Sequence, residues 1–177
     1  AESLGVSYYS YSKSDQYKRL SLRENLLEHD AGFWNGYWQK TFDRLLSLEA
    51  AHLVFPDHKI LHIESDVVLF KQFPFSEFES LENLAWLSQS LEYDIAAILF
   101  SPSPEHSRWL AERLIEQSNI EPSTGDMIAL RKIRMMDSGQ KIFLLPRFPH
   151  ENNSFAKTSQ GLNILFDGAA FGQWLLG

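Results

Sequence analysis

Apolar residues recur at helical spacing through residues 34–53 and then run together in a short stretch. The steps are mostly three, four and seven residues, as on one face of a helix: Trp34, Trp38, Phe42, Leu45, Leu46 and Leu53. Pro56 predicts that this helix ends before it. Residues 60–70 follow as an apolar stretch with several β-branched residues, which predicts a buried strand. A helix that leads into a buried strand through a short turn is typical of a mostly parallel sheet.

The rest of the chain repeats this alternation of apolar runs and helical spacing. Further strands are predicted at residues 84–87, 95–100 and 141–145, and further helices at residues 76–81, 105–117 and 126–136. Ser76 and Thr124 are the caps expected for the first and last of these helices. Towards the ends we expect a strand at residues 6–11, a short helix or ordered loop at 16–30, an irregular loop at 147–160, and an apolar run entering a helix at 163–176. No linker or internal repeat divides the sequence, so residues 1–177 predict a single α/β domain.

Two acidic residues interrupt the strand predicted at residues 60–70. Glu64 and Asp66 are separated by one residue, so in a strand their side chains share one face. Burying carboxylates costs free energy unless they are paired or bind a metal, and hard divalent cations prefer oxygen ligands. The pair predicts a Mn²⁺ or Mg²⁺ site where a central strand ends; the alternative is that Glu64 pairs with an Arg or Lys and Asp66 caps a turn. His62 shares this face, and we expect a core histidine bonded to a backbone carbonyl.

Charge and composition narrow the class of partner. The chain has 16 Lys and Arg against 23 Asp and Glu, a formal net charge of −7, which argues against a dominant nucleic-acid or anionic-membrane surface. A phosphorylated substrate would then need a local positive element, and a bound cation supplies one. The absence of cysteine excludes disulfides and cysteine-based zinc sites. No apolar run is long enough for a membrane span and no signal peptide is evident, which favours a cytoplasmic location; both ends are abrupt, as in a piece of a longer protein.

Several common catalytic motifs do not occur in the sequence. There is no G-x-G-x-x-G after a strand, no G-x-x-x-x-G-K-[ST], no G-x-S-x-G and no H-E-x-x-H. Dehydrogenase, P-loop ATPase, serine hydrolase and zincin activities therefore lose their usual evidence.

A family resemblance is carried by residues 62–69, His-Ile-Glu-Ser-Asp-Val-Val-Leu, and by Phe-Pro-Phe at residues 73–75. These segments resemble the metal-binding D-x-D region of GT-A-fold nucleotide-sugar glycosyltransferases. The preceding helix, Thr-Gly-Asp-Met at residues 124–127 and the closing residues 166–173 are similar to further segments of these enzymes, in the same order. Glu64 stands where the family has Asp. The family's nucleoside-binding strand is not evident before Val6, so either the chain is a fragment or residues 6–15 do that job in altered form.

The resemblance implies a GT-A-like (Rossmann-like) fold, with a mostly parallel sheet flanked by helices and with the first nucleotide-binding strand missing or altered. It implies transfer of a sugar from a nucleoside diphosphate sugar, by resemblance a UDP-sugar, to a saccharide or other hydroxyl acceptor. The cation would be Mn²⁺ or Mg²⁺, with Glu64, Asp66 and His150 as its ligands. Glu64 is also a candidate for binding the donor through its ribose. The alternative for His150 is an exposed loop histidine.

Four further residues are candidates for catalysis and donor binding. An inverting transfer needs a carboxylate base near the acceptor hydroxyl, and Asp126 is the candidate. Asp167 is a candidate catalytic-site residue that would bind sugar hydroxyls. The alternatives are an acid in the first turn of a helix for Asp126 and the end of a strand for Asp167. Lys40 and Arg44 lie one helical turn apart and can reach phosphates, unless they form a solvated helix face.

The sequence therefore predicts a metal-dependent glycosyltransferase. One alternative is a GT-A-like module that binds sugars or partner proteins without catalysis, which Glu64 and the missing strand favour. A second alternative is a metal-dependent phosphoesterase that uses the same acids to activate water.

Overall fold

The computed structural model describes residues 37–65, 67, 69, 71, 73–139, 141–147 and 166 of the chain. Its elements in chain order are α2 (Tyr37–Val54), β1 (Ile60–Ile63), α3 (Phe75–Glu79), β2 (Leu84–Ser88), β3 (Asp94–Ser101), α4 (Pro104–Ile120), α5 (Asp126–Met136) and β4 (Ile142–Leu144). The elements predicted at residues 6–11, 16–30 and 163–176, and most of the loop at 147–160, lie outside the described residues.

The four strands form one mixed sheet in the order β1-β3-β2-β4. β3 runs antiparallel to both β1 and β2, whereas β4 is parallel to β2. The α/β class is confirmed, but the expectation of a mostly parallel sheet is wrong. The physical reason is the connection between β2 and β3, because residues 89–93 are too few for the crossover that a parallel pair requires. The two strands therefore form a hairpin.

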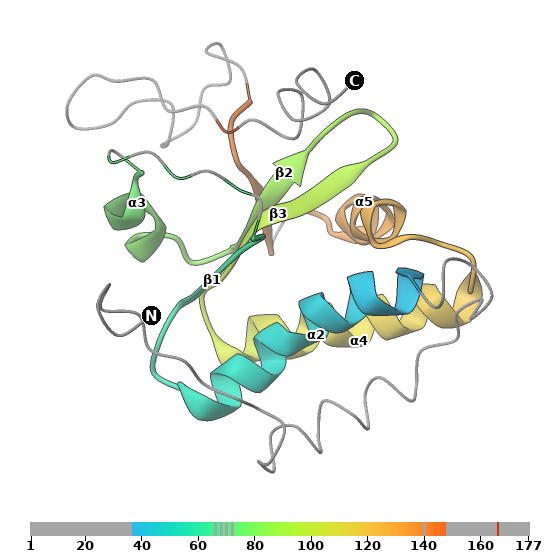
Figure 1. The fold of residues 1–177 in the computed structure, drawn as a ribbon, viewed down its shortest axis with the longest axis horizontal. Helices are drawn as coiled ribbons and strands as arrows, with labels where there is room; N and C mark the ends of the chain where they lie inside the picture. Colours follow the sequence, from blue (N-terminus) through green and yellow to red (C-terminus); the bar gives the residue numbers. More distant parts are fainter. Residues whose placement is uncertain are drawn as a thin grey trace.

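Alternate residues of β2 separate two apolar cores, one on each face of the sheet. Leu84 and Trp86 pack with α2, α4 and α5, which lie on one side of the sheet in Figure 1. Ala85 and Leu87 face the other core, where Phe78 of α3 and Phe166 pack against them. Helices thus flank the sheet on both faces, as the sequence predicts for an α/β fold.

Helix boundaries follow local signals closely, although two of the predicted caps are wrong. α2 ends before Pro56, and α5 has the predicted bounds. Ser103 caps α4, since its hydroxyl accepts a hydrogen bond from the backbone N–H of His106. Thr124 is not the cap of α5, whose N-cap is Gly125 without a side-chain bond. Ser76 lies inside α3, because this helix already begins at Phe75.

β1 is shorter than the strand predicted at residues 60–70. Its last pair with β3 joins Ile63 to Ile98, and the Glu64 N–H then donates to the Ala97 carbonyl at 3.0 Å. The Val67 N–H donates to the Glu64 carbonyl at 3.1 Å, so the chain turns at Glu64. Among the described strands β1 pairs with β3, whose register with β2 shifts between Phe100 and Ile95, the stretch of β3 that faces the end of β1. Strand parity therefore relates His62 to Glu64 but does not extend past the turn.

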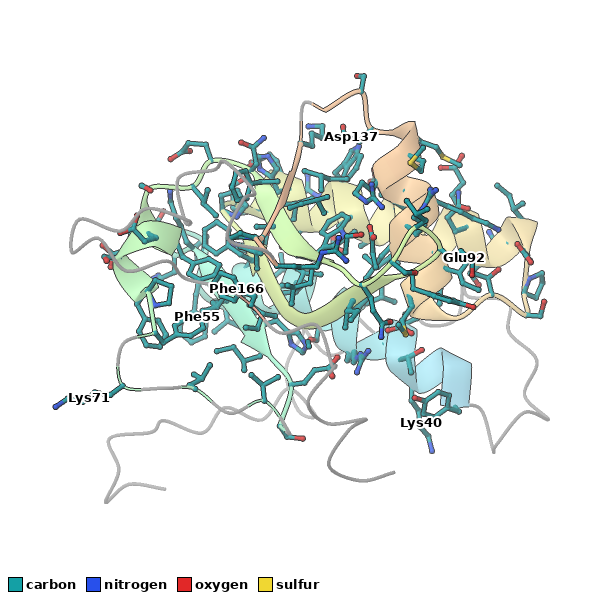
Figure 2. All side chains as sticks on the ribbon, turned by 90° about the horizontal axis from the view of Figure 1, so that it is seen from above. Lys40, Phe55, Lys71, Glu92, Asp137 and Phe166 are labelled. Carbon is teal, nitrogen blue, oxygen red and sulfur yellow. The ribbon has the colours of Figure 1, made fainter. Side chains whose placement is uncertain are left out.

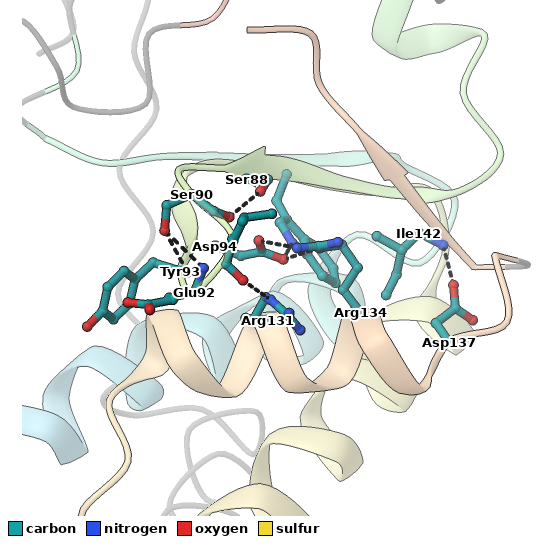
Figure 3. A network of polar contacts seen from close by, with 11 residues as sticks. Ser88, Ser90, Glu92, Tyr93, Asp94, Arg131, Arg134, Asp137 and Ile142 are labelled. Carbon is teal, nitrogen blue, oxygen red and sulfur yellow. Dashed lines mark hydrogen bonds and ion pairs between the residues drawn. The ribbon is translucent and has the colours of Figure 1, made fainter.

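A polar clamp fixes α5 against the β2–β3 hairpin, as Figure 3 shows. The fully buried carboxylate of Asp94 accepts hydrogen bonds from Arg134 Nε at 2.6 Å and Nη2 at 3.0 Å. Trp86 Nε1 donates to the same carboxylate at 3.0 Å. One turn earlier on α5, Arg131 Nε donates to the Leu91 carbonyl at 2.6 Å. These bonds set the position of α5, and with it the position of Asp126 at its first residue.

A second buried polar group lies near the other end of β1. His52, which is 2 % exposed, has Nδ1 at 2.7 Å from Ser107 Oγ and donates through Nε2 to the His58 carbonyl at 3.1 Å. Ser107 Oγ lies in turn 2.8 Å from Ser101 Oγ. Burial lowers the pKa of His52, partly offset by its hydrogen bond to the His58 carbonyl and by the charge of Glu105. The network ties α2, α4 and the end of β3 together around a neutral imidazole.

Stability should therefore fall as the solution is acidified from pH 8 towards pH 5.5. The unfolded chain binds a proton at a histidine below about pH 6.5, whereas folded His52 resists protonation, so acid favours the unfolded state. His106 adds to this, because burial and the nearby Lys141 lower its pKa as well. We expect a slope of up to about 1.4 kcal/mol per pH unit for each such histidine. Urea unfolding at several pH values measures it, and His52→Gln should flatten the profile; equal slopes in the two proteins would exclude His52 as the cause.

Candidate functional site

Three charged residues from separate parts of the chain meet beyond the end of β1. Arg44 of α2 contacts Glu64 through Nη1 and Oε1 at 2.7 Å, and Asp126 through Nη2 and Oδ2 at 2.6 Å. The side chain of Asp126 is 3 % exposed, compared with 20 % for Glu64 and 34 % for Arg44. One guanidinium thus joins a buried carboxylate on one side to a partly exposed carboxylate on the other.

Each of the three residues is placed by a local feature of its element. Arg44 is next to Leu45 and Leu46, which anchor α2 in the core. Glu64 comes directly after the last residue pair of β1 and β3. Asp126 occupies the first turn of α5, where the partial positive charge of the helix N-terminus favours a carboxylate. The structure therefore brings Arg44, Glu64 and Asp126 together, as candidates that the sequence identified separately.

A hollow of about 380 Å³ opens beside this group, lined by Arg44, His62, Ile63, Glu64 and Ser65. His62 is opposite Leu99 in the sheet and belongs to the same face as Glu64, as parity predicts. The backbone bond expected for His62 is not made by Nε2, which is buried and has no hydrogen-bond partner within the described residues. Burial and the charge of Arg44 both lower the pKa of His62, so the imidazole is neutral at pH 7.

Among the described residues, the charged side chains that meet beside the hollow sum to a negative value. Arg44 contributes one positive charge and Glu64 and Asp126 one negative charge each, which leaves a net charge of −1 when His62 is neutral. Asp66, two positions after Glu64 in the sequence, is a further acid that lies outside the described residues. Such a site attracts cations and repels a bare diphosphate. Electrostatics therefore favour a cation as part of any phosphate complex here.

Four predicted site residues remain. One points away from the sheet, and three lie outside the described residues. Lys40 lies one helical turn before Arg44 but is exposed and extends away from the sheet, as Figure 2 shows. Lys40 therefore belongs to a solvated helix face, which was the alternative prediction for it. Asp66, His150 and Asp167 lie outside the described residues. Glu64 pairs with an arginine, which was the alternative to metal binding at that position.

Of the three predicted metal ligands, Glu64 is the one that the structure describes. Within the described residues, no group of three His, Asp or Glu side chains gathers closely enough to hold an ion. Glu64 nevertheless has the ligand chemistry that Mn²⁺ or Mg²⁺ requires, namely carboxylate oxygens at the edge of a hollow. Its type and place fit a cation, whose binding would compete with the contact to Arg44.

The burial of Asp126 bears on its predicted role as a general base. Its carboxylate is nearly covered and bonded to the Arg44 guanidinium, whereas a general base must come within hydrogen-bond reach of the proton that it removes. The carboxylate instead holds Arg44 in place. The sequence could not reveal this pairing, because the partners are 82 positions apart and no local pattern relates them.

Comparisons of the chain with known proteins find no matching family model, no matching curated protein and no matching solved structure. The helices that the structure describes include none with both the length and the apolar character needed to cross a membrane. The function must therefore be inferred from the residues of the site and from the sequence resemblance.

Proposed function

We propose that this chain acts as a metal-dependent glycosyltransferase that takes its sugar from a nucleoside diphosphate donor, with a UDP-sugar as the first donor to test. The observation that carries the proposal is the convergence of Arg44, Glu64 and Asp126 beside one hollow at the end of β1. These residues come from three segments that resemble glycosyltransferases in the same order along the sequence. Their meeting at one point supports a shared role in one site.

The charge of the site supports a requirement for a cation. With a net charge of −1 around the hollow, a diphosphate gains little attraction from the protein alone. When bound, Mn²⁺ or Mg²⁺ would act as a Lewis acid that stabilises the negative charge of the departing diphosphate. Asp66 and Glu64 are the residues proposed to hold it, with His150 as a further candidate.

The chain's own residues orient the donor site. Asp126 fixes the Arg44 guanidinium, and Arg44 in turn fixes the carboxylate of Glu64 at the edge of the hollow. Preorganised charges of this kind favour the transition state because they need not be reoriented during the reaction. We therefore assign Asp126 a positioning role and leave Asp167 as the candidate for contact with the acceptor.

One observation favours a second candidate, a module that binds nucleotide sugars or partners without catalysis. The Asp126 carboxylate, the proposed base, is nearly covered and bonded to Arg44, which keeps it from an acceptor in this arrangement. A site that keeps its cation and nucleotide but has no working base would bind the donor without transferring the sugar.

Calorimetric titration of UDP and GDP, with and without Mn²⁺, tests the proposal. We expect UDP to bind measurably only with Mn²⁺, and Asp66→Ala to weaken this binding by at least about tenfold through loss of a metal ligand. Asp57→Ala is the matched control, since Asp57 is an exposed acid in the turn before β1. UDP affinity that does not depend on Mn²⁺, or is equal in Asp66→Ala, would contradict the proposal. Metal-dependent binding without release of sugar from UDP-sugars would instead identify the non-catalytic module.

A further inference from the structure

His62 has an unused ring nitrogen at the site. Nε2 is buried and has no hydrogen-bond partner among the described residues, and the side chain lines the same hollow as Glu64 and Arg44. Buried polar atoms in folded proteins are nearly always satisfied, and exceptions call for a ligand, an ion or a water. Within the described residues, His62 Nε2 is therefore a nitrogen at the hollow for which the chain supplies no partner.

The backbone places His62 and Glu64 close enough for one ion to bind both, once the His62 ring rotates its covered Nε2 towards the hollow. The two residues are on the same face of one extended segment, with a single residue between them. Positions two apart in a strand are about 6.6 Å from each other along the chain. An imidazole and a carboxylate with this separation can lean towards an ion between them, at the bond lengths of about 2.1 Å that divalent metals make with nitrogen and oxygen.

We propose that His62 is a ligand of the cation that Glu64 helps to hold. The inference rests on the proposed function for the presence of a cation, and it adds a nitrogen donor to a set of oxygen donors. Imidazole favours later first-row metals such as Co²⁺ and Zn²⁺, whereas Mg²⁺ and Ca²⁺ are bound by oxygen ligands. The ratio of the affinity for Co²⁺ or Zn²⁺ to the affinity for Mg²⁺ should therefore be larger than at a site made of two carboxylates alone.

Exposure of the three charged side chains indicates how the cation is accommodated. Glu64 and Arg44 are partly exposed, so their contact can open, whereas Asp126 is nearly covered and keeps its bond to Arg44. Glu64 then exchanges the guanidinium for the cation, while Arg44 continues to neutralise the buried Asp126. No buried charge is left without a partner, because Arg44 stays with Asp126.

Titrations with Co²⁺ and with Mg²⁺, in the absence of nucleotide, test the inference directly. We expect His62→Gln to weaken Co²⁺ binding at least about tenfold, as expected for loss of a ligand, and to change Mg²⁺ binding less than about threefold. The control is His58→Gln, because His58 is an exposed histidine in the turn before β1. Its Co²⁺ affinity should equal that of the unaltered protein. Equal Co²⁺ affinity in His62→Gln would overturn the inference and indicate that Nε2 is satisfied by water.

A second measurement avoids dependence on the folding of the variant. In the unaltered protein, diamagnetic Zn²⁺ should change the chemical shift of the His62 ring nitrogen that binds it and leave the ring nitrogens of His58 unchanged. Ring-nitrogen shifts of His62 that stay unchanged on saturation with Zn²⁺ would overturn the inference. Mn²⁺-dependent UDP binding that persists in His62→Gln at full strength would also overturn it while leaving the proposed glycosyltransferase intact. Metal binding through His62 without any UDP binding would reject the proposed function and keep the metal site.

Discussion

Arg44→Met should lower the free energy of unfolding by about 3–5 kcal/mol, the cost of removing one partner from a buried ion pair. Asp126 is 3 % exposed and its carboxylate is bonded to Arg44, so the variant leaves a negative charge in the protein interior without its guanidinium. Methionine preserves most of the length of the apolar stem, which limits the loss of packing. Urea unfolding of the variant and the unaltered protein measures the difference.

A double variant separates the charge effect from the packing effect. Asp126→Asn removes the negative charge that Arg44→Met leaves unpaired. The double variant should therefore lose less free energy of unfolding than the sum of the losses in the two single variants. Arg108→Met is the control on a neighbouring helix, because Arg108 is mostly exposed and 3.8 Å from Glu49. Its loss should stay below about 1 kcal/mol. A comparable, small effect of Arg44→Met would mean that the Arg44–Asp126 pair contributes little to holding α2 and α5 together.

Helices in this chain follow local signals, which is why their limits can be predicted from the sequence. Pro56 marks the end of α2, and the apolar spacing of residues 126–136 gives α5 its bounds. The sheet depends on pairings between distant residues, and local patterns do not encode them. Residues 89–93 contain no glycine, proline or asparagine to indicate a hairpin. The Ser90 hydroxyl makes the turn instead, by accepting hydrogen bonds from the backbone N–H of Glu92 and Tyr93.

The same distinction explains what the sequence could predict about the site. An acid pair after a strand indicates that positive charge is needed nearby, but it does not identify the source of that charge. For Glu64 the described residues supply it through Arg44, which the sequence had suggested as a phosphate ligand. A pairing of this kind depends on how α2 and α5 pack on the sheet, so it emerges only in three dimensions. Asp66, His150 and Asp167 stay sequence predictions.

Arg134→Met should destabilise the protein by about 3–5 kcal/mol, because Asp94 is fully buried and would keep, among the described residues, the Trp86 N–H as its one side-chain partner. Lys132→Met is a matched control two positions away on α5, since Lys132 pairs with Glu121 at the surface. We expect that control to lose less than about 1 kcal/mol in urea unfolding.

The clamp at Arg134 should also control the mobility of α5 and therefore the placement of Asp126. If these bonds hold the helix on the hairpin, Arg134→Met should increase amide hydrogen exchange in α5 more than in α2, which does not contact Asp94 through this network. The Arg44–Asp126 contact at the start of α5 would loosen with it, because the helix carries the carboxylate. An equal rise in exchange in both helices would show that Arg134 supports global stability alone. Protection of α5 that is unchanged would show that its apolar packing suffices to place Asp126.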